Sequence, residues 1–552
     1  MFDVRGLEIH SQRMWRWESV RRSLDLMERL GMNTLIFHQN DIIDQIVLPR
    51  AYFSDELMWR RRPVRLHTCD NNRHYLARVA REAGRRGITL YLEVKEIWYP
   101  EGLLEIHPGL RPTGEAVCPT DPFWWEFLRA KMIELVEILP EIGGVIVSPA
   151  TRESRVSIAA NDCTCPRCAS YRPEDWYRNL LAAMEEPLAR AGKRLIVRDF
   201  SYTSEGQSFA AMAAQAVSSE IIVALKNTPH DFYPTFPDNP LIGRTGNCPE
   251  WVEFDTWGQF FGLGFFPAGV LEDMQQRLRR CRAKGVNGVW FRTDWEGMTE
   301  ASSFNSLNLL NVFGGGMLAA NPDCDLSAVY RAWMDFGLSL PLSEESVGAP
   351  PLAVDDEARA ILPEIMRSSW RIIERTLFVR GHVFHEDGMF PSSVNRAFDM
   401  MVRIHGRDQW DPQASQLVEP TPENYIVILE EKRQALAEAV ALERLVARIS
   451  APLGEGLRLI VELLGWYVRG FAACAELCFL DEMKTRGIPS SGLAGPDLHA
   501  RLQTALRSAA ALRRDLVERL AGTSYPHYAY WLLDTGRLDR LIEDVESRIR
   551  YH

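Results

Sequence analysis

Short apolar runs in this sequence repeatedly end in charged, histidine or amide side chains. The run GGVIVSP leads into Arg152 and Glu153, and the run WVEFDTW contains Glu253 and Asp255. Carboxyl groups that line one pocket can share acid–base work, because one can hold a proton for a leaving group while another activates water or attacks directly. The pattern therefore predicts carboxylate-based catalysis if the fold brings these run ends together.

Eight such runs alternate with amphipathic helical stretches in the N-terminal part of the chain. This alternation predicts a (β/α)8 barrel. A doubly wound open sheet is the alternative, but no glycine-rich phosphate loop follows the first run, which disfavours a dinucleotide-binding fold. The expected strands are residues 6–10, 33–38, 88–94, 143–149, 194–200, 220–227, 251–257 and 288–294.

Beyond residue 320 the strand signals fade, and long helical segments such as 423–450 and 456–487 follow. We therefore expect a catalytic barrel over residues 1–320 and an α-helical C-terminal domain over residues 321–552. The segment 339–356 is expected to be a connection. The apolar faces of the helices are expected to be mainly packing surfaces, and a homodimer through this domain is kept as a hypothesis.

The overall composition excludes several classes of protein. The chain has 552 residues, is 46% hydrophobic and carries a formal net charge of -11, which argues against a nucleic-acid partner. The start MFDVRGLEIHSQ lacks the basic and apolar regions of a secretory signal, and no apolar run stands out at membrane-spanning length. Ten cysteines without a regular framework fit a reducing compartment. We expect a cytoplasmic protein with no membrane partner.

In a barrel, alternate residues of each strand face the lumen and the surrounding helices. The apolar face of the seventh strand must meet the helices, so Glu253, Asp255 and Trp257 are expected to point inward. Lumens are normally filled by branched apolar side chains, and burying many charges without function is costly. Structural ion pairs near the rim are the alternative for any single residue. The other polar residues expected at the strand ends are His10, His38, Asn40, Lys95, Arg198, Lys226, Arg292 and Asp294.

Carboxylates, aromatic rings and amides around a pocket suit sugar recognition and glycoside hydrolysis. Trp257 and Trp290 are candidates for a wall that stacks on a sugar, although aromatic residues at strand ends more often belong to the core. The cations Arg152, Arg198, Lys226 and Arg292 would suit a substrate that carries a carboxylate. The candidate catalytic carboxylates are Glu153, Asp231, Glu253 and Asp255.

Two stretches of the sequence resemble the α-glucuronidases of glycoside hydrolase family 67. KNTPHDFYPTFPDNPLIG followed by EWVEFDTWGQFFG is similar to that family's Lys-Asn-Gly-Pro-x-Asp-Phe segment and its following Glu-Phe…Gln-Glu-Tyr segment. CPTDPFWWEFLRAKMIELVEILPEIGGVIV is similar to the segment before its catalytic acid. The resemblance, that of a distant relative, runs from about residue 6 to residue 320. It implies a (β/α)8 barrel, a helical C-terminal domain and inverting chemistry without a cofactor.

The resemblance also implies roles for individual residues. Glu153 lies where the family keeps its general acid, and Asp231 matches one of two carboxylates that activate water. Arg198 and Lys226 match positions that contact the sugar. The second water-activating carboxylate of the family corresponds to Gln259, which cannot take a proton, so Asp231 alone or helped by Glu253 or Asp255 would be the base. This departure favours a sugar other than glucuronic acid, such as another acidic one.

The stretch NDCTCPRC places Cys163, Cys165 and Cys168 close together after Glu153. Cys-x-Cys-x-x-Cys spacing can hold structural zinc, but such a site needs four ligands. Cys118 or His107 could complete the set. A thiol-rich turn that braces the loop without a metal is the alternative, and a catalytic zinc is not expected because no histidine-rich ligand set accompanies it.

The leading hypothesis is an inverting exo-glycosidase that releases a terminal, acidic sugar, uronic or sialic, from an oligosaccharide. A second hypothesis is a carbohydrate-binding protein on a barrel that has lost catalysis, motivated by Gln259. A third is a lyase acting on uronates.

Overall fold

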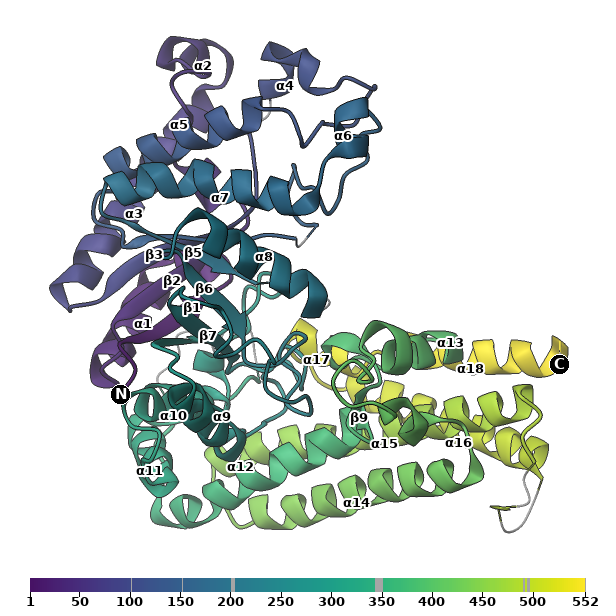
Figure 1. Cartoon of the computed structure of the whole chain (residues 1–552). Coiled ribbons are helices and arrows are strands. Elements are labelled where there is room, and N and C mark those ends of the chain that lie inside the picture. The colour runs from purple at the N-terminus through teal and green to yellow at the C-terminus, as the bar shows by residue number, and fades with distance from the viewer. Residues whose placement is uncertain are drawn as a thin grey trace.

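Eight parallel strands close into a barrel in the computed structural model, in the order β1 to β8 with β8 pairing β1 (Figure 1). The structure describes residues 1–100, 102–150, 152–199, 204–342, 351–489, 492–493 and 497–551. All eight predicted strands are confirmed, although residue 200 at the end of the fifth lies outside the described residues. The strands are β1 Val4–Ile9, β2 Thr34–His38, β3 Thr89–Lys95, β4 Gly144–Ser148, β5 Arg194–Arg198, β6 Ile222–Lys226, β7 Glu250–Asp255 and β8 Gly288–Arg292.

Helices connect the strands on the outside of the barrel, except between β6 and β7, where residues 227–249 form turns. Short additional helices lie in the segments after β2, β3 and β4. The main connecting helices are α1 Trp17–Arg29, α3 Pro63–Arg85, α5 Phe123–Ile138, α7 Pro173–Arg190, α8 Ser204–Val217, α9 Leu271–Ala283 and α10 Leu309–Ala320. The additional ones are α2 Asp55–Arg61, α4 Leu103–Ile106 and α6 Pro166–Ser170.

The predicted alternation along the strands is what the structure shows. Outward side chains such as Leu7, Val145 and Val252 join the main hydrophobic core between strands and helices. Inward side chains divide into two layers. The lower layer is apolar and consists of Ile36, Ile146, Ile196, Ile222, Ala224, Trp251 and Trp290. The upper layer, at the carboxyl ends of the strands, is polar and charged, which is where barrel enzymes carry their active sites.

The C-terminal region is helical, as predicted, and extends toward the lower right of Figure 1. The segment 343–350 of the expected connection lies outside the described residues. A two-stranded hairpin, β9 Phe378–Val379 with β10 His382–Val383, interrupts the helices. The helices include α11 Leu326–Phe336, α12 Asp356–Leu377, α13 Val394–Phe398, α14 Pro422–Val446, α15 Leu453–Thr485, α16 Leu498–Ala521, α17 His527–Leu532 and α18 Thr535–Tyr551.

One helix, α15, is long and apolar enough to cross a membrane by length and composition. The expectation that no segment stands out in this way is therefore wrong. The apolar window of α15 is 72% buried, and the helix packs against α14, α16 and α18. These are the properties of the central helix of a bundle.

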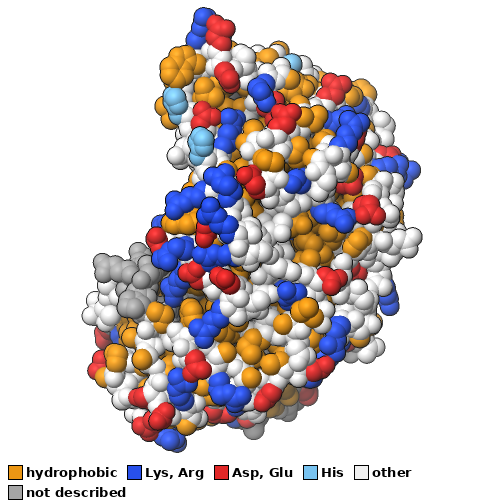
Figure 2. All heavy atoms as spheres, turned by 90° about the vertical axis from the view of Figure 1, so that its left-hand side faces the viewer, with side chains coloured by type: hydrophobic (Ala, Val, Ile, Leu, Met, Phe, Trp, Pro, Cys, Tyr) orange, Lys and Arg blue, Asp and Glu red, His pale blue; other side chains and the backbone are white. Residues whose placement is uncertain are grey.

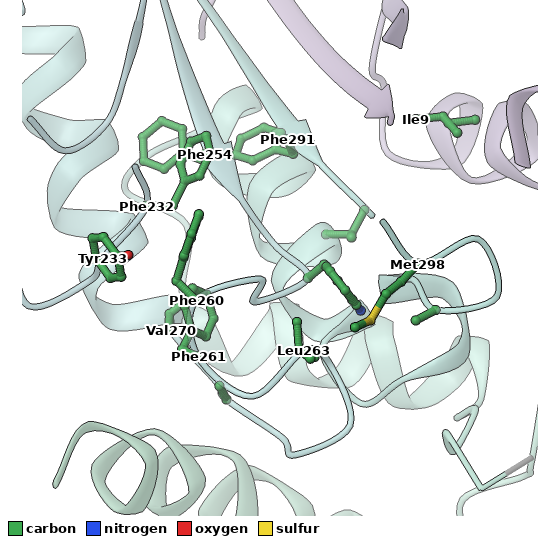
Figure 3. Close-up of a cluster of buried hydrophobic side chains, with 14 of the residues drawn as sticks. Ile9, Phe232, Tyr233, Phe254, Phe260, Phe261, Leu263, Val270, Phe291 and Met298 are labelled. Atoms are coloured by element: carbon green, nitrogen blue, oxygen red, sulfur yellow. The ribbon is translucent and has the colours of Figure 1, made fainter. Parts of the chain in front are cut away.

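Aromatic side chains join the barrel to the helical region. Figure 3 shows Phe232, Tyr233, Phe260 and Phe261 gathered below the ends of β7 and β8. The ring centroids of Tyr233 and Phe260 are 4.8 Å apart, and Phe261 meets Trp370 of α12 edge to face at 6.0 Å. The segments after β6 and β7 are thereby packed against the helical region.

The side of the molecule that lies at the left of Figure 1 has a mixed surface (Figure 2). Lys and Arg side chains gather at mid-height, beside a hollow in the outline, with acidic side chains among them. Hydrophobic atoms are scattered over the rest of this face, as is usual for the surface of a folded protein.

Candidate active site

A hydrogen-bonded layer of buried charged residues fills the upper lumen. Arg198 donates to both carboxylate oxygens of Glu253, at 2.6 and 2.9 Å, and its Nη1 lies 3.4 Å from Glu93 Oε1. Ser148 Oγ donates to Glu93 at 2.8 Å, and His38 Nδ1 lies 2.9 Å from Glu8 Oε1. All of these side chains are buried, because they point inward from their strands at the upper end of the lumen.

This layer sets the protonation of its own members. Burial raises the pKa of Glu8 well above its ordinary value, and the neighbouring Glu253 and Glu93 carboxylates add to the effect. Burial alone would also raise the pKa of Glu253, but Arg198 holds it below the ordinary value. The negative charges of this layer are therefore balanced within it, with Arg198 as the central cation.

Three partly exposed carboxylates stand at the mouth above this layer. Glu153, whose side chain is 40% exposed, has Oε2 3.0 Å from Lys95 Nζ. Asp231, 17% exposed, accepts from Lys226 Nζ at 2.5 Å. Glu296, 42% exposed, lies 2.6 Å from Nε2 of the buried His10 ring. Each of these three carboxylates thus contacts a buried basic side chain located at the end of a strand.

Asp231 is held in an unusual backbone conformation. Its φ is +45°, in the left-handed region, and Thr228 Oγ1 donates to its carbonyl oxygen at 2.5 Å. Burial alone would raise the pKa of the Asp231 carboxyl, but Lys226 and His230 hold it well below the usual range. Non-glycine residues with positive φ cost free energy and cluster at functional sites, so this one marks Asp231 as a functional candidate.

The segment that carries Glu153 is fixed by a buried carboxyl group just after β3. Glu96 Oε1 accepts the backbone N–H of Ala150 at 2.8 Å, and the backbone N–H of Glu96 donates to Ser154 Oγ at 2.9 Å. Burial raises the pKa of Glu96 to about 7. Ala150 and Arg152 both have positive φ, +66° and +60°, in the left-handed region.

Two predicted catalytic carboxylates are fully engaged within the protein. Both oxygens of Glu253 are bound by Arg198, as described above, and the side chain has no exposure. Asp255 accepts the backbone N–H groups of Trp257, Gly258 and Gln259 at 2.9 to 3.1 Å. In this state they organise the strand end and the loop that follows it.

The predicted stacking wall of Trp257 and Trp290 does not form, and that prediction is wrong. Trp257 is buried under the segment after β7, where a Cβ on Gly264 would lie 2.3 Å from its Nε1. Trp290 belongs to the lower lumen layer and donates to Glu8 Oε2 at 2.7 Å. Neither indole has an open face, because Trp257 is covered by the segment after β7 and Trp290 is packed inside the barrel.

Asp294 and Gln259 lie at the site but bind protein groups. Asp294 accepts from the backbone N–H of His10 and from Ser11 Oγ, both at 2.6 Å, which ties the end of β8 to the end of β1. Gln259 Oε1 accepts from Arg292 Nη2 at 2.6 Å, and its Nε2 donates to Asp387 at 3.2 Å. Both residues therefore support the site in the described structure.

The remaining predicted binding residues are spread over the mouth. The rings of His10 and His38 are stacked at 3.5 Å, which brings β1 and β2 together there. Within the described part of the chain, Asn40 Oδ1 is buried without a hydrogen-bond partner and so can accept a bond from a ligand. Arg152 is exposed, whereas Arg292 is buried beside Asp255.

The sequence did not single out Glu296, which the structure places at the mouth. Burial alone would raise its pKa, but His10, Arg292 and Lys95 hold it below the usual range. Glu296 follows β8 by four residues, and the alternation that located the other residues stops at the strand end. Glu8 and Glu93 point inward, where their charges act on Arg198.

Among the residues that the structure describes, two groups of side chains have the composition of metal sites. Glu8, His10 and His38 bring one donor atom each within 4.8 Å of the others. The two carboxylate oxygens of Glu8 already form hydrogen bonds with His38 and Trp290. This set is therefore better explained as a hydrogen-bonded network than as a metal site. The second group is the cysteine cluster, completed by Cys118. His107, the other predicted ligand, packs instead on Tyr52 and Phe123.

A cavity of about 560 Å³ lies between the segments after β2 and β3. Arg155, two residues beyond Glu153, borders it, and the Arg155 guanidinium lies 5.4 Å from the ring centroid of Trp98 and 5.3 Å from that of Tyr99. The cavity is lined by several arginines, Arg61, Arg62, Arg65 and Arg155, together with Asp41, Asp44 and the two aromatic rings.

No protein-family model matches the chain, and no curated protein matches it. Its fold is similar to that of a solved glycoside hydrolase family 138 enzyme targeting pectin rhamnogalacturonan II, with a TM-score of 0.62 and 12% identity. The match covers 93% of this chain and 63% of the enzyme, so this chain spans less than two thirds of its length. At this identity the likeness establishes the fold.

Two further solved structures are more remote. The first is an O-GlcNAc hydrolase mutant from Thermobaculum terrenum, with a TM-score of 0.45 and 10% identity, and the match covers 99% of this chain and 94% of that one. The second is a β-N-acetylhexosaminidase from Bacteroides fragilis. The latter has a TM-score of 0.41 and 14% identity, and the match covers 63% of this chain and 74% of that one.

Proposed function

We propose that this protein is an exo-acting glycoside hydrolase that releases a terminal acidic sugar from an oligosaccharide. The observation that carries the proposal is the mouth of the barrel. Three partly exposed carboxylates, Glu153, Asp231 and Glu296, stand over a buried charged layer at the carboxyl ends of the strands. A pair of such groups is what acid–base cleavage of a glycosidic bond requires.

The acid is assigned from the family 67 resemblance, in which Glu153 occupies the position of the general acid. The pKa values of Asp231 and Glu296 are held low by their basic neighbours, which disfavours either as the group that donates a proton. Asp231, which is kept ionised by Lys226, is assigned as the base that activates water.

The pairing of mouth carboxylates with lysines supports an acidic substrate. A sugar carboxylate entering the mouth would compete with Glu153 for Lys95 and with Asp231 for Lys226, and so release a carboxyl group to act in proton transfer. Arg292 adds a third cation at the same level. The family 138 enzyme with the similar fold targets pectin rhamnogalacturonan II.

Inverting chemistry is proposed from the family 67 resemblance alone, which assigns Glu153 as the acid and Asp231 as the base. In an inverting enzyme the two carboxyl groups are about 6.5–9.5 Å apart, which leaves room for the attacking water. The expected cytoplasmic location and the homodimer through the helical region stay proposals.

A product screen tests the proposal. Purified protein is incubated with oligosaccharides that end in uronic or sialic acids and with matched oligosaccharides that end in neutral sugars. Free sugar is followed by chromatography, and the first-formed anomer by NMR. We expect release of one acidic monosaccharide with inverted anomeric configuration. Release of neutral sugars alone would refute the acidic specificity, and a retained anomer would refute inversion.

The same screen separates the two alternatives. A lyase would form an unsaturated product that absorbs in the ultraviolet, whereas a hydrolase would not. Calorimetric binding of one oligosaccharide without product after long incubation would favour a carbohydrate-binding protein. Gln259 forms hydrogen bonds with Arg292 and Asp387. This is the observation that supports the carbohydrate-binding protein as the second candidate function.

A further inference from the structure

Four cysteines from two separate segments converge beside the loop that carries Glu153. Cys118 lies between β3 and α5, and Cys163, Cys165 and Cys168 lie between β4 and α7. All four side chains are buried, and they form a cluster of their own that is separate from the main core. Among the ten cysteines of the chain, only these four gather within the described residues.

The sulfur atoms have the spacing of a tetrahedral metal site. Cys118 Sγ lies 3.7 Å from Cys165 Sγ and 3.5 Å from Cys168 Sγ, and all four sulfurs lie within 4.8 Å of one another. With Zn–S bonds of about 2.3 Å, the sulfurs of a tetrahedral site are about 3.8 Å apart. A disulfide would need about 2.05 Å, and the four cysteines are free.

Hydrogen-bonding groups surround the same sulfurs. The backbone N–H of Cys168 donates to Cys165 Sγ at 3.5 Å, and the Thr120 hydroxyl lies 3.3 Å from Cys118 Sγ and 3.2 Å from Cys168 Sγ. Thr113 Oγ1 lies 3.6 Å from Cys163 Sγ. Such donors stabilise sulfur in its thiolate form, which is the form that binds a metal.

We propose that Cys118, Cys163, Cys165 and Cys168 bind one structural zinc ion. The set is closed, because four cysteine ligands leave no position for water, so the ion would have no catalytic part. It would join the β3–α5 segment to the β4–α7 segment at a point ten residues beyond Glu153. The zinc would therefore fix the loop that carries the proposed acid, in addition to the contact that Glu96 makes from β3.

Metal content tests the proposal without any reference to catalysis. Protein made without a polyhistidine tag is dialysed and measured by inductively coupled plasma mass spectrometry. We expect about one zinc per chain. The variants Cys118→Ser and Cys165→Ser should lose most of this zinc. The control Cys324→Ser, which changes a partly exposed cysteine outside the cluster, should keep it.

A titration of the wild-type protein keeps the test decisive if the serine variants fail to fold. A mercurial reagent is added stepwise, and released zinc is followed with a chromogenic chelator. Zinc should be released as the cluster thiols react. Protein that contains no zinc and takes up none after reduction would overturn the proposal. Iron with visible absorption in place of zinc, or a disulfide among these cysteines, would also overturn it.

Discussion

Asp231 is a mostly buried carboxylate, with 17% of its side chain exposed, that stays ionised because of its neighbours. Burial would raise its pKa, and Lys226 and His230 more than offset this effect. If Asp231 is the base, activity is lost as the pH falls through its pKa. Replacing Lys226 by Met removes the cation and leaves the burial, so the acid limb of the kcat/KM profile should move upward by about one pH unit or more.

The control for this prediction is Lys284→Met, which removes an exposed lysine at the end of α9. Its profile should match that of the wild type. An unchanged acid limb in the Lys226→Met variant would show that Asp231 is not the group that titrates in catalysis.

At the residue scale, the sequence predicted the members of the buried layer and missed part of the mouth. Alternation along a strand placed His38, Arg198 and Glu253 correctly, because the lumen dictates the direction of each side chain. Beyond the strand ends that rule no longer applies. Asp255, the last residue of β7, binds three backbone N–H groups of the loop that follows, and Glu296, four residues after β8, lies at the mouth where the sequence did not predict it.

At the element scale, Glu96 links the end of β3 to the segment after β4, and its burial makes this link pH-dependent. Its folded pKa of about 7 lies above the ordinary value of 4.5, so the folded state binds more protons than the unfolded state between these values. The free energy of unfolding should therefore fall as the pH rises from 4.5 through 7. The shift corresponds to about 3 kcal/mol.

Glu96→Gln keeps an oxygen for the Ala150 N–H and cannot ionise. Between pH 4.5 and pH 8, the free energy of unfolding of the wild type, measured in urea, should fall by about 3 kcal/mol relative to that of this variant. The exposed Glu137→Gln should follow the wild type. If the difference in the free energy of unfolding between the wild type and Glu96→Gln did not change with pH, a neutral, buried Glu96 would be contradicted.

The close approach of β4 and β5 depends on a glycine. A Cβ added at Gly144 would lie 1.9 Å from the carbonyl oxygen of Arg194, whereas one at Gly84 of α3 would meet nothing within 4 Å. Gly144→Ala should lower the free energy of unfolding by about 3 kcal/mol or prevent folding. Gly84→Ala should raise it by about 0.5–1 kcal/mol. Equal effects of the two changes in chemical unfolding would refute this strand register.

The elements themselves could be predicted because their patterns are local. Each strand run is bounded by turn residues, and helices such as α5 begin and end at proline or glycine signals. The irregular segment 227–249, which positions Asp231, has no repeating pattern, so its conformation follows from tertiary packing of Tyr233 and Phe260 and could not be derived from sequence.

At the scale of the whole molecule, the barrel and the helical region share one core. Phe266, in the segment after β7, packs on Tyr467 of α15 with ring centroids 4.6 Å apart, and Phe265 packs on Tyr528 of α17. Tyr467 also donates a hydrogen bond to the Gly388 carbonyl oxygen. The region after the barrel therefore holds the loops at the active-site end of the barrel in place.

We accordingly expect one cooperative thermal transition for the whole chain. Phe266→Ala should lower the free energy of unfolding by about 3–5 kcal/mol and shift this single transition in calorimetry. The control Phe123→Ala removes a partly buried aromatic side chain away from the junction and should have a smaller effect. Two separate transitions, with only one affected by Phe266→Ala, would contradict a shared core.

The central claim is that Glu153 donates a proton to the leaving oxygen. The most direct measurement compares Glu153→Gln with the wild type on two glycosides of the released sugar, one natural with a poor leaving group and one nitrophenyl glycoside with an activated leaving group. The variant should lose about 10²- to 10⁴-fold in kcat/KM on the natural glycoside and little on the activated one, while Glu137→Gln should match the wild type on both. Full activity of Glu153→Gln on the natural glycoside would contradict the account.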